Sequence, residues 1–97
     1  MLFEVSYTLN PSRANQPLLD SLMKSDGGFM HYFDSCWLIA TNEDVTQLYN
    51  RLKPFFLDSD LFLIVEIKQS SAYYGWLPQE AWDWMKDKYN KGWAKLY

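Results

Sequence analysis

The clearest pattern in the chain is the alternation of apolar and polar residues from 2 to 9. Odd-numbered positions hold large apolar side chains, and even-numbered positions from Glu4 onward hold polar ones. A period of two is typical of a half-buried strand. Asn10-Pro11 ends this strand with a turn signal. A second long strand is predicted at 61–68, where the odd-numbered residues share one face and an apolar run precedes Glu66.

Between these strands the pattern predicts a hairpin and two helices. The hairpin joins Phe29–Phe33 to Cys36–Thr41 through the turn pair Asp34-Ser35. The first helix is predicted at 15–25, where leucines recur at helical spacing and Asn15 is a suitable N-cap. The second follows TNED at 41–44, with Thr41 or Asn42 as its cap, and ends at Pro54.

The predicted order is strand, helix, strand, strand, helix, strand, which is that of a ferredoxin-like fold. We therefore expect an α+β domain over residues 1–70, with one antiparallel βαββαβ sheet and two helices on one face. Residues 71–97 follow as a linker and an aromatic-rich C-terminal helix that begins near Pro78. An isolated helix of this length is marginal in water, so we expect it to pack on the same domain or on a dimer mate.

Composition narrows the classes of function. The chain has 97 residues, 19% of them aromatic, and a net charge of −3. The aromatic excess favours self-association, whereas the acidic balance argues against a nucleic-acid-binding module. Cys36 is the one cysteine, so no disulfide can form within the chain. No signal peptide or membrane-spanning run is visible, and we expect a cytoplasmic protein with no membrane partner.

Four segments of the chain carry a resemblance to known proteins. They are VSYTLN (5–10), HYFDSCWLIAT (31–41), RLKPFF before DSDLFLIVEI (51–67) and GWLPQEAWDWMK (75–86). Together they resemble small bacterial and phage proteins labelled SinR-family or hypothetical. Those proteins are similar to the CRISPR-associated small ferredoxin-like endoribonucleases, and toxin–antitoxin or defence components are a related expectation. The resemblance covers most of residues 3–87 and implies a dimerising ferredoxin-like domain that acts on or near nucleic acid.

The first strand departs from that family at one position. In the nucleases, a carboxylate near the end of this strand is taken to hold a divalent metal between two subunits, and related small proteins read Ser-Tyr-Asp-Leu-Asn there. This chain has Thr8 in place of the acid. Magnesium requires charged oxygen ligands, which a hydroxyl does not supply. We therefore predict no metal, no cofactor and no catalytic residue at this strand end, although Thr8, Asn10 and Arg13 remain candidate contacts for an anion or nucleic acid.

The other candidate residues each have an ordinary structural interpretation that we favour. His31 is a possible general base or nucleic-acid contact, but it alternates with apolar residues and fits an edge strand. Asp34 and Ser35 are candidate ligand contacts that also suit a turn. Cys36 fits a core thiol better than a nucleophile. The pair Asp58 and Asp60 fits a solvated turn.

The aromatic C-terminal segment is the least ordinary feature of the sequence. The residues predicted to form an interaction surface are Tyr73, Tyr74, Trp76, Trp82, Trp84 and Trp93. Because few arginines are interleaved with them, packing against protein is favoured over stacking on bases. The sequence thus predicts a non-catalytic interaction or regulatory module that forms a homodimer and has a possible protein partner. A metal-dependent ribonuclease or nucleic-acid-binding protein is the alternative.

Overall fold

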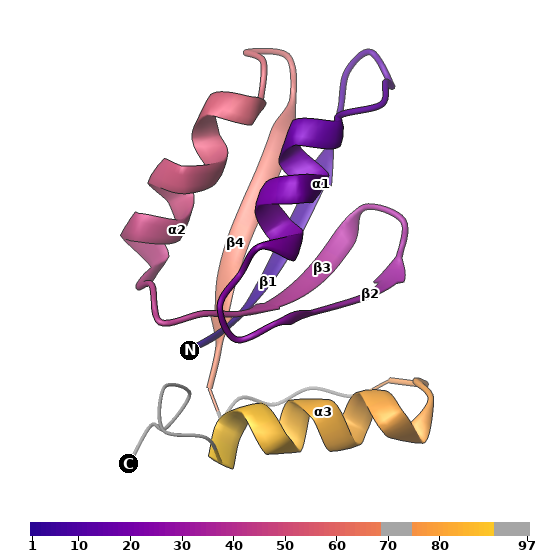
Figure 1. Ribbon diagram of the computed structural model, residues 1–97. Helices are drawn as coiled ribbons and strands as arrows, with labels where there is room; N and C mark the ends of the chain where they lie inside the picture. Colours follow the sequence, from indigo (N-terminus) through magenta and orange to yellow (C-terminus); the bar gives the residue numbers. More distant parts are fainter. Residues whose placement is uncertain (69–74, 91–97) are drawn as a thin grey trace.

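A computed structural model of the chain describes residues 1–68 and 75–90 and confirms the prediction of an α+β fold (Figure 1). The strands are β1 (Leu2–Thr8), β2 (Phe29–Phe33), β3 (Cys36–Ala40) and β4 (Leu61–Ile67). The helices are α1 (Gln16–Met23), α2 (Val45–Leu52) and α3 (Gln79–Asn90), with a short 3-10 turn, η1 (Lys53–Phe55), after α2. In this described part, no helix is both long enough and apolar enough to cross a membrane.

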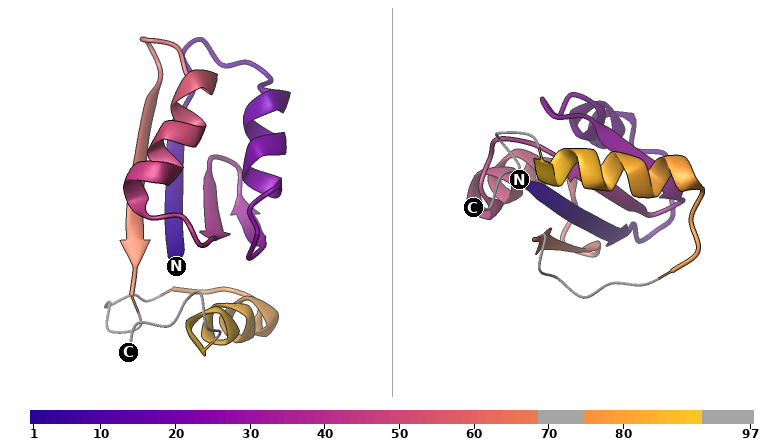
Figure 2. Two further views of the ribbon diagram at one scale, coloured as in Figure 1. Left: turned by 60° about the vertical axis from the view of Figure 1, so that its left-hand side comes forward. Right: turned by 90° about the horizontal axis from the view of Figure 1, so that it is seen from below.

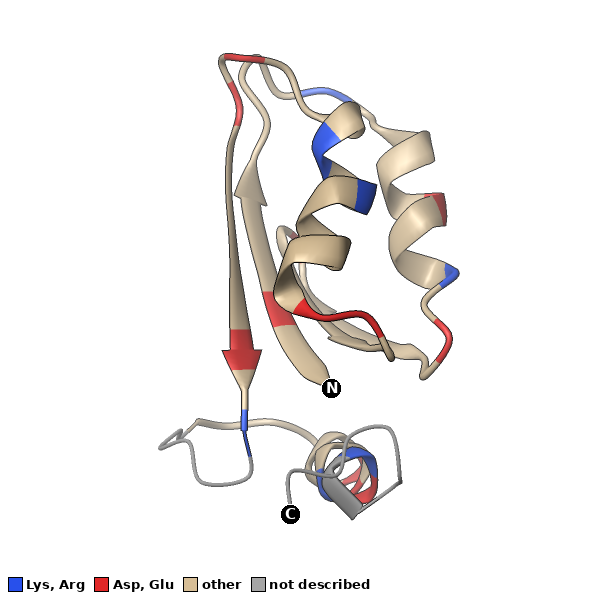
Figure 3. Cartoon of the chain, turned by 90° about the vertical axis from the view of Figure 1, so that its left-hand side faces the viewer, with Lys and Arg blue, Asp and Glu red and all other residues tan. Residues whose placement is uncertain are grey.

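All four strands belong to one antiparallel sheet in the order β2-β3-β1-β4. β1 lies inside the sheet, with Leu2 opposite Ala40 of β3 and Thr8 opposite Leu61 of β4. β2 and β4 are therefore the two edges. Figure 3 marks most of the charged residues on the helices and loops, and Glu66 is the one charged residue within β4.

Helices α1 and α2 cover one face of the sheet (Figure 2). The alternate residues Phe3, Val5 and Tyr7 of β1 point to this face and are buried. They pack with Trp37 and Ile39 of β3 and with four helix leucines, namely Leu18, Leu22, Leu48 and Leu52. The main core thus uses the odd-numbered side of β1, as its alternation predicts.

Local side-chain bonds determine where the two helices begin. Asn15 caps α1 as predicted, because its side chain accepts a hydrogen bond from the backbone N–H of Leu18. The cap of α2 is Asp44, which exchanges hydrogen bonds with Gln47 in a capping box. The prediction of Thr41 or Asn42 as that cap is wrong, since the helix begins later and the Thr41 hydroxyl donates to Glu43 instead.

Arg51 connects the two helices through its guanidinium group. Its Nε and Nη2 donate to the Glu43 carboxylate at 2.8–3.0 Å. Its Nη1 donates to the backbone carbonyl and the hydroxyl of Ser21 in α1, and Nη2 also reaches the Ser25 hydroxyl at 3.1 Å. The planar guanidinium therefore holds the end of α2 against α1 with several charge-assisted bonds.

Helix α3 lies across the end of the sheet where β1 begins (Figures 1 and 2), and its buried residues contact side chains on the face of the sheet away from α1 and α2. Ala81 and Met85 of α3 are buried against Leu2, Met30 and Ala40. Tyr32 of β2 also donates a hydrogen bond from its hydroxyl to Glu80 at 2.8 Å. The C-terminal helix thus packs on its own domain and leaves the β4 side of this outer face uncovered.

Candidate functional site

Most of the predicted anion or nucleic-acid contacts meet at one pocket beside the end of β1. The pocket has a volume of about 360 Å³. Among the residues that line it are five of the six predicted contacts, namely Thr8, Arg13, His31, Asp34 and Ser35. Asn10 is the sixth, and it does not line the pocket. The order of the strands brings these residues together, because the β2–β3 turn and the loop after β1 lie at the same end of the sheet (Figure 1).

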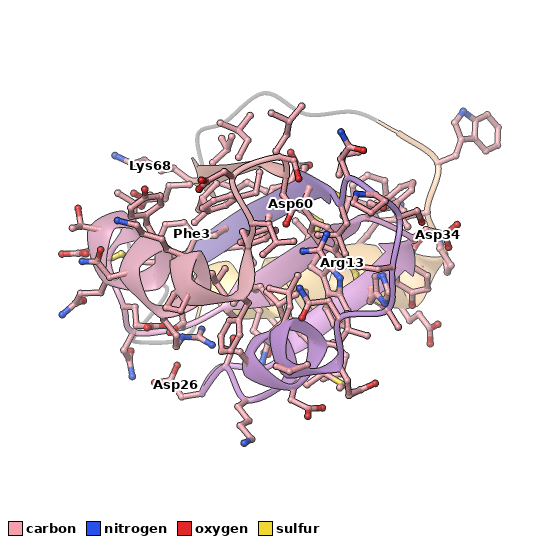
Figure 4. All side chains as sticks on the ribbon, turned by 90° about the horizontal axis from the view of Figure 1, so that it is seen from above. Phe3, Arg13, Asp26, Asp34, Asp60 and Lys68 are labelled. Atoms are coloured by element: carbon pink, nitrogen blue, oxygen red, sulfur yellow. The ribbon has the colours of Figure 1, made fainter. Side chains whose placement is uncertain are left out.

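Arg13 forms an ion pair with Asp60 next to this pocket, and Figure 4 shows the two side chains close together. Its Nη1 and Nη2 donate to the two carboxylate oxygens of Asp60 at 2.9 and 2.6 Å. The backbone N–H groups of Asn10 and Leu57 donate to the same carboxylate at 2.8 and 2.7 Å. These four bonds engage all of the acceptor positions of the Asp60 carboxylate.

The environment of Asp60 holds the carboxylate in its charged form. The Arg13 guanidinium is the main cause that keeps the pKa of Asp60 well below its ordinary value, and burial acts in the opposite direction. The backbone N–H groups of Leu57 and Asn10 lower the pKa further. The prediction that Asp60 belongs to a solvated turn is therefore wrong, since the side chain is buried and joins the loop after β1 to the start of β4.

This ion pair bears directly on the missing acid at Thr8. Thr8 is exposed and lies opposite Leu61, so the residue before Leu61 places a carboxylate close to the end of β1. That carboxylate, Asp60, is already saturated by hydrogen bonds, and the charge of Arg13 is neutralised by it. Within residues 1–68 and 75–90, no group of three or more His, Cys, Asp or Glu is arranged to hold a metal ion.

His31 and Cys36 lie in the two strands of the hairpin. The His31 ring stacks on Trp37 with centroids 3.8 Å apart, and its Nε2 lies 3.2 Å from the Asp34 carbonyl oxygen. Cys36 is half-buried, and Ser6 donates a hydrogen bond to its sulfur at 3.6 Å. Burial raises the pKa of the Cys36 thiol, so the reactive thiolate is disfavoured.

The predicted aromatic surface divides into three groups. Trp82 and Trp84 are partly buried and pack against the cluster under α3. Trp76 is 99% exposed, beside a groove of about 210 Å³ between α3 and the sheet. Tyr73, Tyr74 and Trp93 lie outside the described residues. Among the described members of the set, Trp76 is therefore the one presented to solvent, whereas Trp82 and Trp84 also hold α3 on the sheet.

A second apolar surface was not recognised from the sequence. On β4, Leu61, Leu63 and Val65 are 72%, 63% and 43% exposed, and they form a row on the face away from α1 and α2. We call these three residues the β4 row. The residues between them, Phe62 and Ile64, pack against the main core. The run LFLIV is the sequence feature that could have indicated this surface. An edge strand with apolar residues on both faces leaves one set exposed when helices cover only the other face.

Comparisons with protein-family models, with curated proteins and with solved structures return no match to this chain.

Proposed function

We propose that this protein is a non-catalytic interaction module that forms a homodimer through the β4 side of its sheet. We also propose that the domain is ferredoxin-like and related to the small bacterial and phage proteins that its segments resemble. The βαββαβ order and the inner position of β1 between β3 and β4 support the fold assignment.

The observation that carries the proposal is the exposure of the β4 row. Single exposed apolar residues are common, but three in a row on an edge strand form a continuous surface. The exposed fractions of Leu61, Leu63 and Val65 add to about 1.8 side chains, so burial would contribute about 3–5 kcal/mol per copy. Two copies would gain about 5–11 kcal/mol, against an association cost of about 4–15 kcal/mol. Full burial of the row would thus support a weak dimer at most, and a tight dimer requires further contacts.

The polar pocket at the end of β1 supports the non-catalytic part of the proposal. Its arginine, Arg13, is already paired with Asp60, and the Asp60 carboxylate has no oxygen position left for a metal or a proton transfer. The exposed Trp76 adds an anchor of the kind that is enriched at protein interfaces. A partner protein on the α3 side is thus compatible with a dimer on the β4 side.

Sedimentation equilibrium of the full chain, from about 1 to about 200 µM, tests the dimer. We expect a reversible monomer–dimer equilibrium, and a monomer over the whole range overturns the proposal. Incubation with single- and double-stranded RNA and DNA, with and without Mg²⁺, tests the non-catalytic part. Metal-dependent cleavage that copurifies with the protein through several columns would contradict it, and so would cleavage lost in a Thr8 or Asp34 variant.

A further inference from the structure

Among residues 1–68 and 75–90, no strand pairs with the outer edge of β4, and the hydrogen-bonding groups of this edge can be assigned residue by residue. The N–H of Tyr7 donates to Ser35 and the N–H of Thr41 donates to Met1, so odd-numbered residues of β1 face β3. Even-numbered residues of β1 therefore face β4, where they lie opposite the odd-numbered residues 61, 63, 65 and 67. It follows that Phe62, Ile64 and Glu66 direct their N–H and C=O groups away from the sheet.

Space is available along this edge for another strand. A groove of about 590 Å³ runs beside β4 and is lined by Leu61–Ile64 together with Val45, Thr46 and Tyr49 of α2. Natural edge strands are usually protected by proline, lysine, a bulge or a covering segment. The seven residues of β4 contain no proline, glycine or lysine, and the register of β4 with β1 is continuous. Apart from the single charge of Glu66 near its end, β4 thus lacks, within the described part of the chain, the usual devices that block strand addition.

We propose that β4 of a second copy pairs antiparallel with this edge, about a two-fold axis at Ile64, to form a continuous eight-stranded sheet. The inference rests on the proposed homodimer and supplies the further contacts that the β4 row alone does not. In this register Ile64 lies opposite Ile64 of the second copy, and Phe62 lies opposite Glu66. The outward N–H and C=O groups of these three residues then form about six hydrogen bonds across the axis.

The chain itself favours this register over its neighbours. Antiparallel pairing of residues 61–67 with an identical strand overlaps all seven residues only when the centre is at Ile64. A centre at Leu63 or Val65 leaves five paired residues. A centre midway between two neighbouring residues would bring the outward N–H and C=O groups of one copy opposite groups of the other copy that face β1.

The proposed register also extends the apolar surface across the axis. Leu63 would lie beside Val65 of the second copy, and Leu61 beside Ile67. The two β4 rows would then form one patch on the outer face and cover part of each other's exposed area. On the other face, Val45 and Tyr49 of each α2 line the groove where the two copies meet. The second copy therefore complements both the backbone edge and the apolar side chains.

Amide hydrogen exchange, measured by NMR above and below the dissociation constant, tests the pairing. We expect the N–H groups of Phe62, Ile64 and Glu66 to exchange at least about tenfold more slowly in the dimer. The N–H groups of Leu63 and Val65 face β1 and should be protected in both states. A dimer with rapid exchange at all three outward positions overturns the edge pairing but leaves the proposed homodimer intact, whereas a monomer at every concentration overturns both.

Proline substitution provides a variant that affects the outer edge selectively. Glu66→Pro removes an N–H that points away from β1, and proline is tolerated in edge strands at such positions. Two of the intermolecular hydrogen bonds are lost per dimer, so we expect the dissociation constant to rise roughly 30-fold or more. Glu66→Ala is the matched control, and it should change the dissociation constant by less than about threefold. Equal dimerisation of the two folded variants contradicts the proposal.

Single cysteines test the register in a Cys36→Ser background. With Ile64→Cys, the two thiols face each other across the axis at a Cα separation of about 5.5 Å, within disulfide range. With Leu63→Cys or Val65→Cys, the same atoms are roughly 8 Å apart and do not bridge readily. Under mild oxidation by copper phenanthroline we expect covalent dimer for Ile64→Cys above the other two. Faster crosslinking of Leu63→Cys or Val65→Cys would assign a different centre and overturn the register.

Discussion

Replacing Leu63 by threonine should weaken the dimer while leaving the domain folded. Leu63 lies in the middle of the β4 row and is 63% exposed in the single chain. Threonine keeps a good strand-forming residue at this position and lies opposite Ser6 of β1, with which it is compatible. The substitution therefore removes apolar area from the proposed interface without introducing a backbone defect.

The expected magnitude follows from the exposed area. Full burial of a leucine contributes about 1.5–3 kcal/mol, so covering the exposed 63% contributes about 1–2 kcal/mol per copy. Two copies lose about 2–4 kcal/mol, which raises the dissociation constant roughly 30- to 1,000-fold. This is an upper bound, because the second copy covers only part of the exposed area of Leu63 and because threonine retains a methyl group. In the monomer, the substitution also removes the part of Leu63 that is already covered, and this loss lowers the free energy of unfolding by only about 0.5–1 kcal/mol.

Sedimentation equilibrium measures the dissociation constant, and urea unfolding of dilute protein measures monomer stability. Leu57→Thr is a matched control, because Leu57 is 57% exposed but lies in the loop before β4. We expect this control to leave the dissociation constant within about threefold of the original. If both variants dimerise as well as the original chain, or both lose dimerisation equally, the β4 row is not the interface.

Three further predictions concern the folded domain. Tyr7→Phe leaves the buried Trp37 Nε1–H without its 3.2 Å acceptor and should lower the free energy of unfolding by about 1–3 kcal/mol in urea titrations followed by fluorescence. Asp60 has a lowered pKa in the folded state, so it stabilises the fold above its unfolded pKa near 3.8, and this contribution is lost as the pH falls below that value. Asp60→Asn should therefore be less stable at pH 7 and show a smaller drop in melting temperature between pH 4 and pH 2; an unchanged drop would contradict the assignment. Arg51→Lys cannot reproduce the bonds that join α2 to α1 and should cost about 2 kcal/mol, whereas an unchanged urea midpoint would mean that the cluster contributes little.

Much of the candidate pocket was predictable, but its electrostatics were not. Thr8, Asp34 and Ser35 follow from local signals, because strand ends and turns are marked by neighbouring residues in the chain. The state of Arg13 depends on Asp60, which is 47 positions away. No local pattern distinguishes an arginine available to an anion from one already paired by a distant carboxylate. The predicted anion contact at Arg13 was for this reason the part of the site that most needed the tertiary structure.

The sequence by itself determined the type and order of the elements, because alternation, helical spacing and capping residues act over a few neighbouring positions. The α+β class, β1 and its ending before Asn10 follow from such patterns. Only the tertiary structure decided which face of β4 is covered. Phe62 and Ile64 are as apolar as Leu61 and Leu63, so a period of two groups them correctly but assigns neither set to the core. That choice depends on the position of α2 over an edge strand, and it is the reason that the β4 row is left exposed.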